Sequence, residues 1–162
     1  MLIETKKEVD LLELKNFVES KHKIVGLDLG KKRIGVSIST SDMNGALPLR
    51  TIKYSSIKAL VEELLEIIKA HDVKAMIIGL PINMDGTEGK SSQSIRDKSS
   101  KILSFIEVPY SFWDERLSTS AVARFYDTSS KTRQKRKNEK KDIDNLASAF
   151  ILEGAIEYIK RN

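Results

Sequence analysis

The sequence contains no cysteine and only two histidines among its 162 residues. Disulfides and thiolate zinc sites are therefore excluded, and a reducing cytoplasm is the setting that we expect. Any metal ion would be bound through oxygen atoms, which favours Mg²⁺ or Mn²⁺. Long apolar runs are also absent, so the sequence predicts neither a membrane-spanning helix nor a secretory signal.

Apolar residues make up 40% of the chain and charged residues 31%, a balance typical of one soluble globular domain with a hydrophobic core. The chain has a net charge of +5, and this excess of positive charge is concentrated between positions 131 and 141, where only Glu139 opposes the lysines and arginines. We predict a mobile basic loop at about 128–141, which either contacts nucleic acid or is simply a solvated charged loop. The candidate contacts within it are Lys135, Arg136 and Lys137.

The order of apolar patterns predicts an α/β domain at residues 24–162, after an amphipathic extension at 1–23 that packs on the domain edge or on a partner. Apolar and β-branched runs predict strands at 24–29, 34–39, 47–54, 73–80 and 108–113. Three- and four-residue apolar spacing predicts helices at 57–68, at about 95–106, from 118 onwards and at 143–158. An initial hairpin followed by alternating helices and strands predicts a mixed five-stranded sheet with helices on its faces.

Asp28 stands inside the first predicted strand, where carboxylates are disfavoured. A buried carboxylate needs a partner, a cation or a proton, so we interpret Asp28 as a ligand of a divalent metal ion. Other carboxylates that can converge on it stand at the end of the last strand and the start of the last helix: Asp114, Glu115, Asp142 and Asp144. One divalent ion, or a pair about 4 Å apart, relieves the repulsion among such groups and suits phosphodiester cleavage.

Each of these later carboxylates also has a purely structural interpretation. Asp142 is better explained as the N-cap of the last helix, and Asp144 can simply favour the helix dipole. Asp114 or Glu115 can pair with Arg116, which can alternatively clamp a phosphate. Sequence spacing does not decide between these interpretations, and it leaves open whether Asp114 or Asp142 also binds metal.

Four segments resemble, in order, the four motif blocks of the YqgF family of RuvX-type, Holliday-junction-resolvase-like nucleases. These segments are Gly-Leu-Asp-Leu-Gly-Lys-Lys-Arg-Ile-Gly-Val (26–36), Gly-Leu-Pro-Ile-Asn-Met-Asp-Gly-Thr-Glu-Gly (79–89), Asp-Glu-Arg-Leu-Ser-Thr (114–119) and Asp-Asn-Leu-Ala-Ser-Ala-Phe-Ile-Leu (144–152). Four blocks in order are far more specific than any one of them. Two features depart from the family pattern: the extension at 1–23, and Trp113, which stands where the family usually has histidine.

The resemblance implies a ribonuclease H-like fold and a metal-dependent endonuclease of the two-metal type that acts on structured nucleic acid. The cellular role that it implies is maturation of the precursor of small-subunit (16S) ribosomal RNA, with pre-ribosomal particles as partners. The family's acidic residues fall on Asp28, Glu115 and Asp144, which become the predicted catalytic and metal-binding residues. Structured RNA is favoured over branched DNA, and we expect a monomer or a weak homodimer.

Further nucleic-acid contacts are predicted at the ends of the strands. Lys31, Lys32 and Arg33 in the hairpin turn can touch phosphates, as can Arg116. Asn83 either contributes to a backbone nest near the substrate or belongs to a plain turn.

Three other functions stay open at this point. The chain can be a branched-DNA resolvase, or a nucleic-acid-binding module of the same fold without catalysis. The segment Asp-Leu-Gly-Lys-Lys-Arg-Ile-Gly (28–35) also resembles the phosphate-binding hairpin of sugar kinases and actin-like ATPases. Those enzymes enclose a nucleotide between two such domains, whereas this chain has room for one.

Overall fold

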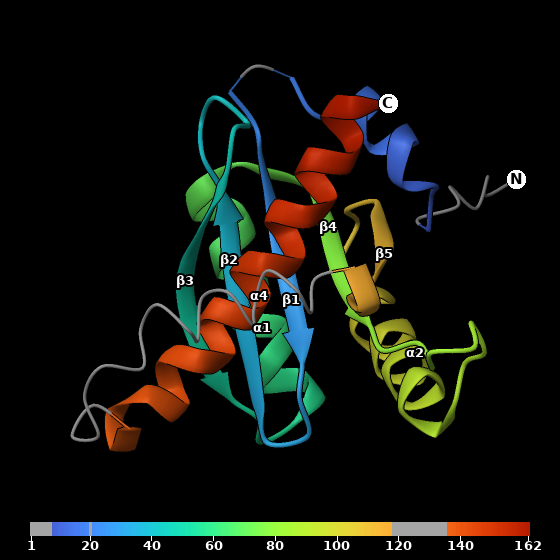
Figure 1. Cartoon of the computed structure of the whole chain (residues 1–162). Helices are drawn as coiled ribbons and strands as arrows, with labels where there is room; N and C mark the ends of the chain where they lie inside the picture. The colour runs from blue at the N-terminus through green and yellow to red at the C-terminus, as the bar shows by residue number, and fades with distance from the viewer. Residues whose placement is uncertain (1–7, 20, 118–135) are drawn as a thin grey trace, which may run out of the picture.

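The computed structural model describes residues 8–19, 21–117 and 136–162, and the side chains of all of these except 136–145. Five strands form one sheet in the order β3-β2-β1-β4-β5 (Figure 1). The strands are β1 (Lys23–Leu29), β2 (Arg33–Ser39), β3 (Ala46–Lys53), β4 (Val73–Leu80) and β5 (Tyr110–Asp114). The helices are η1 (Leu11–Phe17), α1 (Ile57–His71), α2 (Lys90–Leu103), η2 (Glu115–Leu117) and α4 (Arg136–Arg161), of which η1 and η2 are 3₁₀-helices.

The sheet is mixed, as the sequence predicts. β1 pairs antiparallel with β2, and β2 pairs antiparallel with β3. On its other side β1 pairs parallel with β4, which in turn pairs parallel with β5. The C-terminal ends of the parallel strands β1, β4 and β5 therefore lie side by side, at the lower end of the sheet in Figure 1. The hairpin turn between β1 and β2 lies at the same end.

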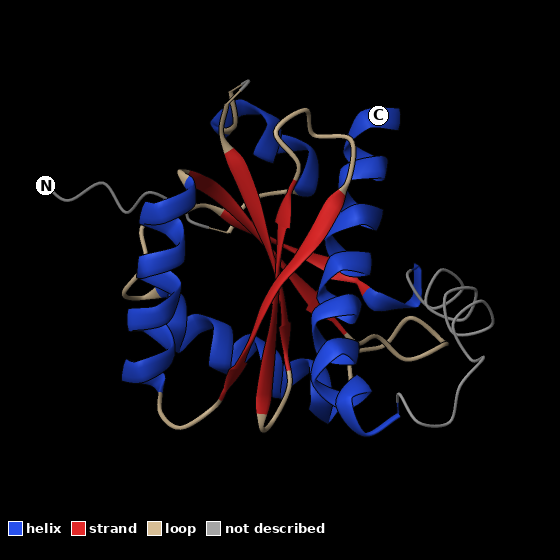
Figure 2. Ribbon diagram, turned by 90° about the vertical axis from the view of Figure 1, so that its left-hand side faces the viewer, coloured by secondary structure: helices blue, strands red, loops and turns tan. Residues whose placement is uncertain are grey.

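Different helices cover the two faces of the sheet (Figure 2). On one face, the apolar stripes of α1 and α2 pack with alternate residues of β1 and β4 in a core that includes Leu27, Leu64, Ile78 and Ile102. On the other face, α4 and η1 pack with the intervening strand residues in a core that includes Leu14, Ile24, Ile77 and Leu152. This arrangement confirms the prediction of helices on both faces.

A small group of polar atoms docks α4 against the centre of the sheet. The buried Ser148 hydroxyl donates to the Gly26 carbonyl oxygen at 2.7 Å and lies 2.9 Å from the Ser37 hydroxyl. The Ser37 hydroxyl in turn lies 2.8 Å from the Ser148 carbonyl oxygen. Gly26 makes this approach possible, since an added Cβ would lie 2.8 Å from the Cβ of Leu152. The helix thus sits at a fixed depth and register on β1.

The N-terminal segment packs on the domain edge, in line with one of the two predicted alternatives. The Val9 backbone amide donates to the Tyr110 carbonyl oxygen at 2.9 Å, so this segment borders β5. Leu14 is fully buried against the α4 face of the sheet. The helix expected here is a short 3₁₀-helix, η1, rather than an α-helix.

The last helix begins earlier than predicted, which corrects two predictions. α4 starts at Arg136, so residues 136–141 are helical rather than part of a loop, and Asp142 lies inside the helix instead of capping it. Straight-chain lysine, arginine and glutamate side chains lose little rotamer freedom in a helix, which explains why the charged segment extends it. The remaining part of the predicted loop and the helix expected from 118 lie outside the described residues.

Replacing Gly26 with alanine tests the close docking of α4. The added methyl group would press on Leu152 and on the Ser37–Ser148 pair, and overpacking of this kind costs about 1–3 kcal/mol. We expect urea unfolding to report that loss for Gly26→Ala. Gly45→Ala is the matched control, because an added Cβ there meets no atom within 4 Å. Equal stability of the two variants would contradict the docking described here.

Candidate active site

Asp28 lies on the face of β1 that α4 covers. Alternate residues of a strand point to the same face, and the preceding alternate residues Ile24 and Gly26 both contact the α4 side. Asp28 is half-buried and lies two residues beyond Gly26, towards the lower edge of the sheet. Asp28 thus lies inside a strand, as the sequence predicts, and on the face of the sheet that is covered by α4.

Glu115 reaches the same face from β5. Ser111 and Trp113 are the buried residues of this strand, and Trp113 packs in the α4 core. Glu115, the next alternate position, is half-buried at the first residue of η2. A carboxylate that follows the strand directly is thus carried onto the α4 face by the strand's own alternation.

Gly79 provides the room that the Glu115 carboxylate occupies. Gly79 lies on β4, between β1 and β5, where it pairs with Trp113. An added Cβ at this position would lie 2.6 Å from Glu115 Oε1 and 2.5 Å from Ile151 Cδ1. The missing side chain lets the Glu115 carboxylate lie over β4, on the side towards β1.

The electrostatics of Glu115 reflect its burial and the acidic residues around it. Burial, reinforced by the negative charges of Asp28 and Asp114, raises the pKa of Glu115 from 4.5 to about 7. Burial disfavours the charged form of a carboxyl group, and nearby like charges disfavour it further. The site therefore holds negative charge that is stable only with a proton or a cation.

Arg116 pairs with Asp114, which decides between two interpretations that the sequence left open. Its guanidinium donates to the Asp114 carboxylate at 2.7 Å from Nη2 and at 3.0–3.1 Å from Nε. Hydrogen bonding from Arg116 lowers the pKa of Asp114. Arg116 Nη1 also donates to the Asn83 carbonyl oxygen at 3.3 Å, and this contact ties the end of β5 to the loop after β4.

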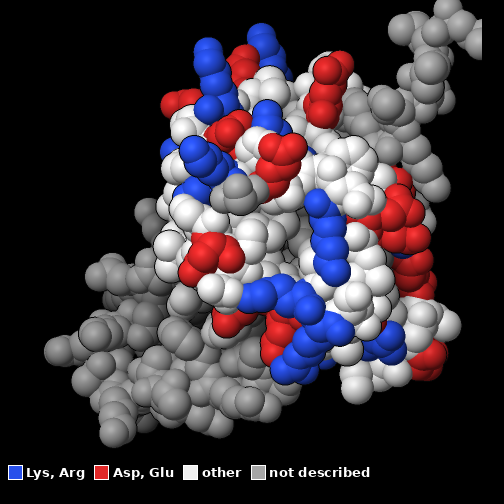
Figure 3. All heavy atoms as spheres, turned by 90° about the horizontal axis from the view of Figure 1, so that it is seen from above, with Lys and Arg blue, Asp and Glu red and all other residues white. Residues whose placement is uncertain are grey.

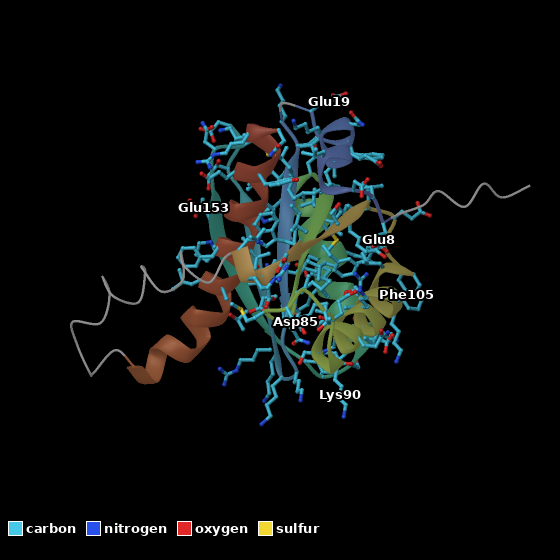
Figure 4. All side chains as sticks on the ribbon, turned by 45° about the vertical axis from the view of Figure 1, so that its right-hand side comes forward. Glu8, Glu19, Asp85, Lys90, Phe105 and Glu153 are labelled. Carbon is cyan, nitrogen blue, oxygen red and sulfur yellow. The ribbon has the colours of Figure 1, made fainter. Side chains whose placement is uncertain are left out.

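The loop after β4 is closed by its own hydrogen bonds. The Asn83 side-chain amide donates to the Thr87 hydroxyl at 3.1 Å, and the Asn83 backbone amide donates to the Thr87 carbonyl oxygen at 2.9 Å. Asp85 accepts from both the backbone amide and the hydroxyl of Thr87, and these bonds lower its pKa. The positive φ of Gly86 completes the turn. Asp85 lies near the lower edge of the sheet (Figure 4), and the contact between Arg116 and the Asn83 carbonyl oxygen places this turn beside the end of β5.

The other predicted contacts lie in two places. Lys31 and Lys32 are exposed in the hairpin turn, and the neighbouring Arg33, the first residue of β2, is half-buried. Arg136, Lys137 and Asp144 belong to α4, but their side chains lie outside the described residues, as does Lys135 entirely. Among the side chains that the structure describes, no three acidic or histidine residues form a metal-binding group.

Sequence reasoning missed three residues that position the site, namely Gly26, Gly79 and Ser148. Each had a signal. A glycine inside an apolar strand often marks the close approach of another element, and this applies to both glycines. Ser148 is buried on the apolar face of a helix, where a hydroxyl needs a hydrogen-bond partner.

The fold matches solved structures of resolvases. The structure entitled "T. thermophilus RuvC in complex with Holliday junction substrate" superposes with a TM-score of 0.55 over 86% of this chain and 95% of that one, at 12% identity. A second Thermus thermophilus RuvC structure gives 0.53 over the same shares. The strand order and the helices on both faces define a ribonuclease H-like protein, as predicted.

Sequence comparison gives the family. The family described as "RuvX: Holliday junction resolvase" matches residues 22–158, and the chain belongs to this family. A protein of Rhodospirillum centenum is 40% identical over 94% of this chain and 82% of its own length. One of Pelagibacter ubique is 42% identical over 86% of this chain and 91% of its own length. Both are named "Putative pre-16S rRNA nuclease". The resemblance noted in the sequence is thereby confirmed.

One further observation concerns membranes. In the part of the chain that the structure describes, no helix combines the length and the apolar character needed to cross a bilayer.

The raised pKa of Glu115 gives a test in metal-free buffer. A carboxyl group whose pKa is higher in the folded chain binds its proton more tightly there. The burial of Glu115 therefore hardly changes the free energy of unfolding below pH 4.5. As the pH rises through about 7, the folded chain has to hold the carboxylate in its charged form, and the free energy of unfolding falls. Because Glu115 is partly exposed, solvent reduces the stability change that this pKa shift implies. With EDTA present, we expect Glu115→Gln to raise Tm by about 2–4 °C at pH 8.5 and to have almost no effect at pH 4.5.

The control is Glu62→Gln, which alters an exposed carboxylate on α1. Thermal unfolding followed by circular dichroism measures both variants at both pH values. A Glu115→Gln shift that is the same at pH 4.5 and pH 8.5 would show that the carboxylate is not in the crowded environment described here.

Proposed function

We propose that this protein is a metal-dependent endonuclease that cleaves structured nucleic acid, and that its substrate is the precursor of 16S ribosomal RNA. The observation that carries the proposal is the Glu115 carboxylate held over Gly79 beside Asp28. The names of the relatives support the RNA substrate. Membership of the RuvX family makes the sugar kinase and actin-like alternative the weaker one.

Asp144 is the third carboxylate of the proposed site, and the backbone supports this assignment. α4 runs antiparallel to β1 (Figure 1), and Ser148 contacts Gly26. Asp144 stands four residues before Ser148, about 6 Å along the helix axis. Asp28 stands two residues beyond Gly26, about 6.6 Å along the strand. The two acidic positions therefore lie at a similar level, on elements that pack against each other.

The described residues fit a divalent cation. Two carboxylates confined on one face of the sheet provide hard oxygen ligands, and their mutual repulsion is relieved by positive charge. Mg²⁺ or Mn²⁺ is the expected ion. When bound, such an ion polarises the phosphodiester and lowers the pKa of water, whether one ion or two are present.

The protein's own residues hold and orient the site. Asp28 and Glu115 are fixed by strand alternation and by the space at Gly79, so their oxygens are in place before substrate binds. Arg116 is held by Asp114 and by the Asn83 carbonyl oxygen at the edge of the site. An arginine held in this way can donate a hydrogen bond to a substrate phosphate at the edge of the site without having to be ordered by the substrate, although its charge is largely balanced by Asp114.

Several finer features belong to the same proposal. We assign the protein to the cytoplasm, with pre-ribosomal particles as its partners and a monomer or weak homodimer as its working form. The alternatives are cleavage of four-way DNA junctions and nucleic-acid binding without cleavage. The first follows the family description, and the assay below distinguishes all three.

Asp28→Asn tests the catalytic assignment. An ion that contributes several kcal/mol loses much of its effect with one ligand neutralised, so the cleavage rate should fall about 100-fold or more. The measurement uses a labelled RNA stem–loop that carries a 16S precursor end, with Mn²⁺ and with EDTA. Asp10→Asn, which alters an exposed carboxylate on the N-terminal segment, is the control and should cleave normally. Cleavage by Asp28→Asn at the wild-type rate, or cleavage that EDTA does not change, would refute the metal mechanism.

The same assay with a four-way DNA junction decides between the substrates. Faster cleavage of the junction than of the RNA would support the resolvase alternative. Binding of both without any cleavage would support the non-catalytic one.

Gly79→Ala tests how Glu115 is positioned. The new methyl group would lie 2.6 Å from Glu115 Oε1 and 2.5 Å from Ile151 Cδ1, which is too close, so the Glu115 carboxylate must leave its position. A misplacement of about 1 Å in a catalytic group can cost about 100-fold in rate. We expect a large loss of kcat with nucleic-acid affinity kept within about threefold. An unchanged kcat in a folded Gly79→Ala variant would show that cleavage does not require the Glu115 carboxylate in its position over Gly79.

A further inference from the structure

A polar hollow of about 490 Å³ lies between α2 and the junction of β3 with α1. Lysine and other polar side chains of α2 line one side, and Tyr54 and Ile57 line the other. Three of the lining residues are Lys90, Lys98 and Lys101. Neither the family motifs nor the proposed catalytic site uses this hollow, so its charge needs an explanation of its own.

The charge of the hollow is predominantly positive. Asp97 is its one acidic lining residue, and Gln93 donates to that carboxylate at 2.9 Å. Lys90 and Lys101 are exposed, so each can reach a ligand in solvent. A group of lysines with a single acidic neighbour favours an anionic ligand.

Lys98 is held in place before any ligand arrives. Its Nζ lies 4.0 Å from the centroid of the Tyr54 ring and donates to the Gly30 carbonyl oxygen at 3.2 Å. The aromatic face and the carbonyl oxygen both stabilise an ammonium group. Partial burial lowers the pKa of Lys98. Because the side chain is already ordered, binding an anion costs less conformational entropy than it would for a free lysine.

The hollow is continuous with the hairpin turn beside the proposed active site. Gly30, which accepts from Lys98, is two residues after Asp28. The Tyr54 backbone amide donates to the Lys32 carbonyl oxygen at 2.8 Å, so the hollow and the turn are joined by two hydrogen bonds. Lys90 lies at the same lower end of the molecule as Asp85 (Figure 4).

The opposite end of the molecule differs in its charge pattern. Seen from above, the described lysines and arginines are mixed with aspartates and glutamates (Figure 3). Some of the charged residues form ion pairs with each other, such as Lys74 with Asp72 at 3.3 Å and Arg161 with Glu157 at 2.6 Å. That end therefore provides matched control lysines.

We propose that Lys31, Lys32, Lys90, Lys98 and Lys101 form one surface, the α2 basic surface, which binds the phosphate backbone of a nucleic-acid arm leading away from the catalytic carboxylates. The proposal rests on the proposed function for the direction of the arm. A polyanion fits better than a single small anion, because the lysines extend from the hairpin turn along α2 rather than converging on one point.

The test compares two double variants in the Asp28→Asn background, which prevents cleavage during binding. Lys90→Gln/Lys101→Gln removes two exposed charges of the α2 basic surface, and Lys21→Gln/Lys69→Gln removes two exposed charges elsewhere. Fluorescence anisotropy measures Kd for a labelled RNA stem–loop and for a four-way DNA junction between 50 and 300 mM KCl. Each lost phosphate contact should lower the slope of log Kd against log [KCl] by about 0.7–0.9.

We expect the first variant to bind at least about fivefold more weakly at the lowest salt, with a slope lower by roughly 1.5. The second should match the parent within twofold. Lys90→Arg/Lys101→Arg should restore binding, since it keeps the charge, and circular dichroism should show all variants folded. The probe that responds identifies RNA or DNA as the source of the phosphates.

Equal affinities and slopes for the two glutamine variants would overturn the inference. That result is distinguishable from a failure of the proposed function. If the protein has no nuclease activity, the protein with Asp28 intact will cleave neither probe, yet the difference between the two variants in binding will persist. If only the inference fails, cleavage remains and the difference disappears.

Discussion

The absence of a side chain on one residue of β4 is the constraint on which the site depends. β4 lies between β1, which carries Asp28, and β5, which ends directly before Glu115. Any Cβ at Gly79 on β4 would lie 2.6 Å from Glu115 Oε1. With that space open, the carboxylate lies over the middle strand under α4. A second glycine, Gly26, lets the same helix approach β1 closely enough for Ser148 to bond to the strand. Two missing methyl groups therefore fix both the acidic residues and the helix above them.

The closeness of the carboxylates works against the stability of the fold and in favour of catalysis. In the protein alone, burial and the charge of Asp28 raise the pKa of Glu115 to about 7, so near neutral pH the site is divided between protonated and strained ionised forms. A bound dication would favour the ionised form of Glu115, because it is attracted to both carboxylates and relieves the repulsion between them. Such a site is consistent with a general pattern in which catalytic groups are held in arrangements that the fold would otherwise avoid.

Much of this could be predicted from the sequence, and the parts that could not have identifiable causes. Periodicity was sufficient for the strands and for α1, because apolar residues at Val73–Leu80 or Ile57–Ile68 leave few alternatives. The carboxylate inside β1 was recognisable because it is unusual there. The start of α4 differs from the prediction because a dense run of charge is typical of a solvated loop, although the residues of this run also have high helix propensity. The pairing of Arg116 with Asp114 rather than Glu115 depends on which face each residue occupies, and three consecutive charges do not specify that. The space at Gly79 is a tertiary contact between three elements, so only the fold reveals it.

A site built around repelling carboxylates has to obtain its affinity for a polyanion from elsewhere. The acidic centre opposes a phosphate until a cation is present, and Arg116 is already engaged by Asp114. Positive charge at the edges can supply binding energy without disturbing the geometry of the centre, and the hairpin turn with the lysines of α2 provides such an edge. This division also separates two kinds of salt dependence, since backbone contacts weaken as salt rises whereas the half-buried carboxylates are screened much less. Binding and cleavage should therefore respond differently to ionic strength, because different parts of the molecule carry them: the hairpin turn and α2 on one side, and the carboxylates under α4 on the other.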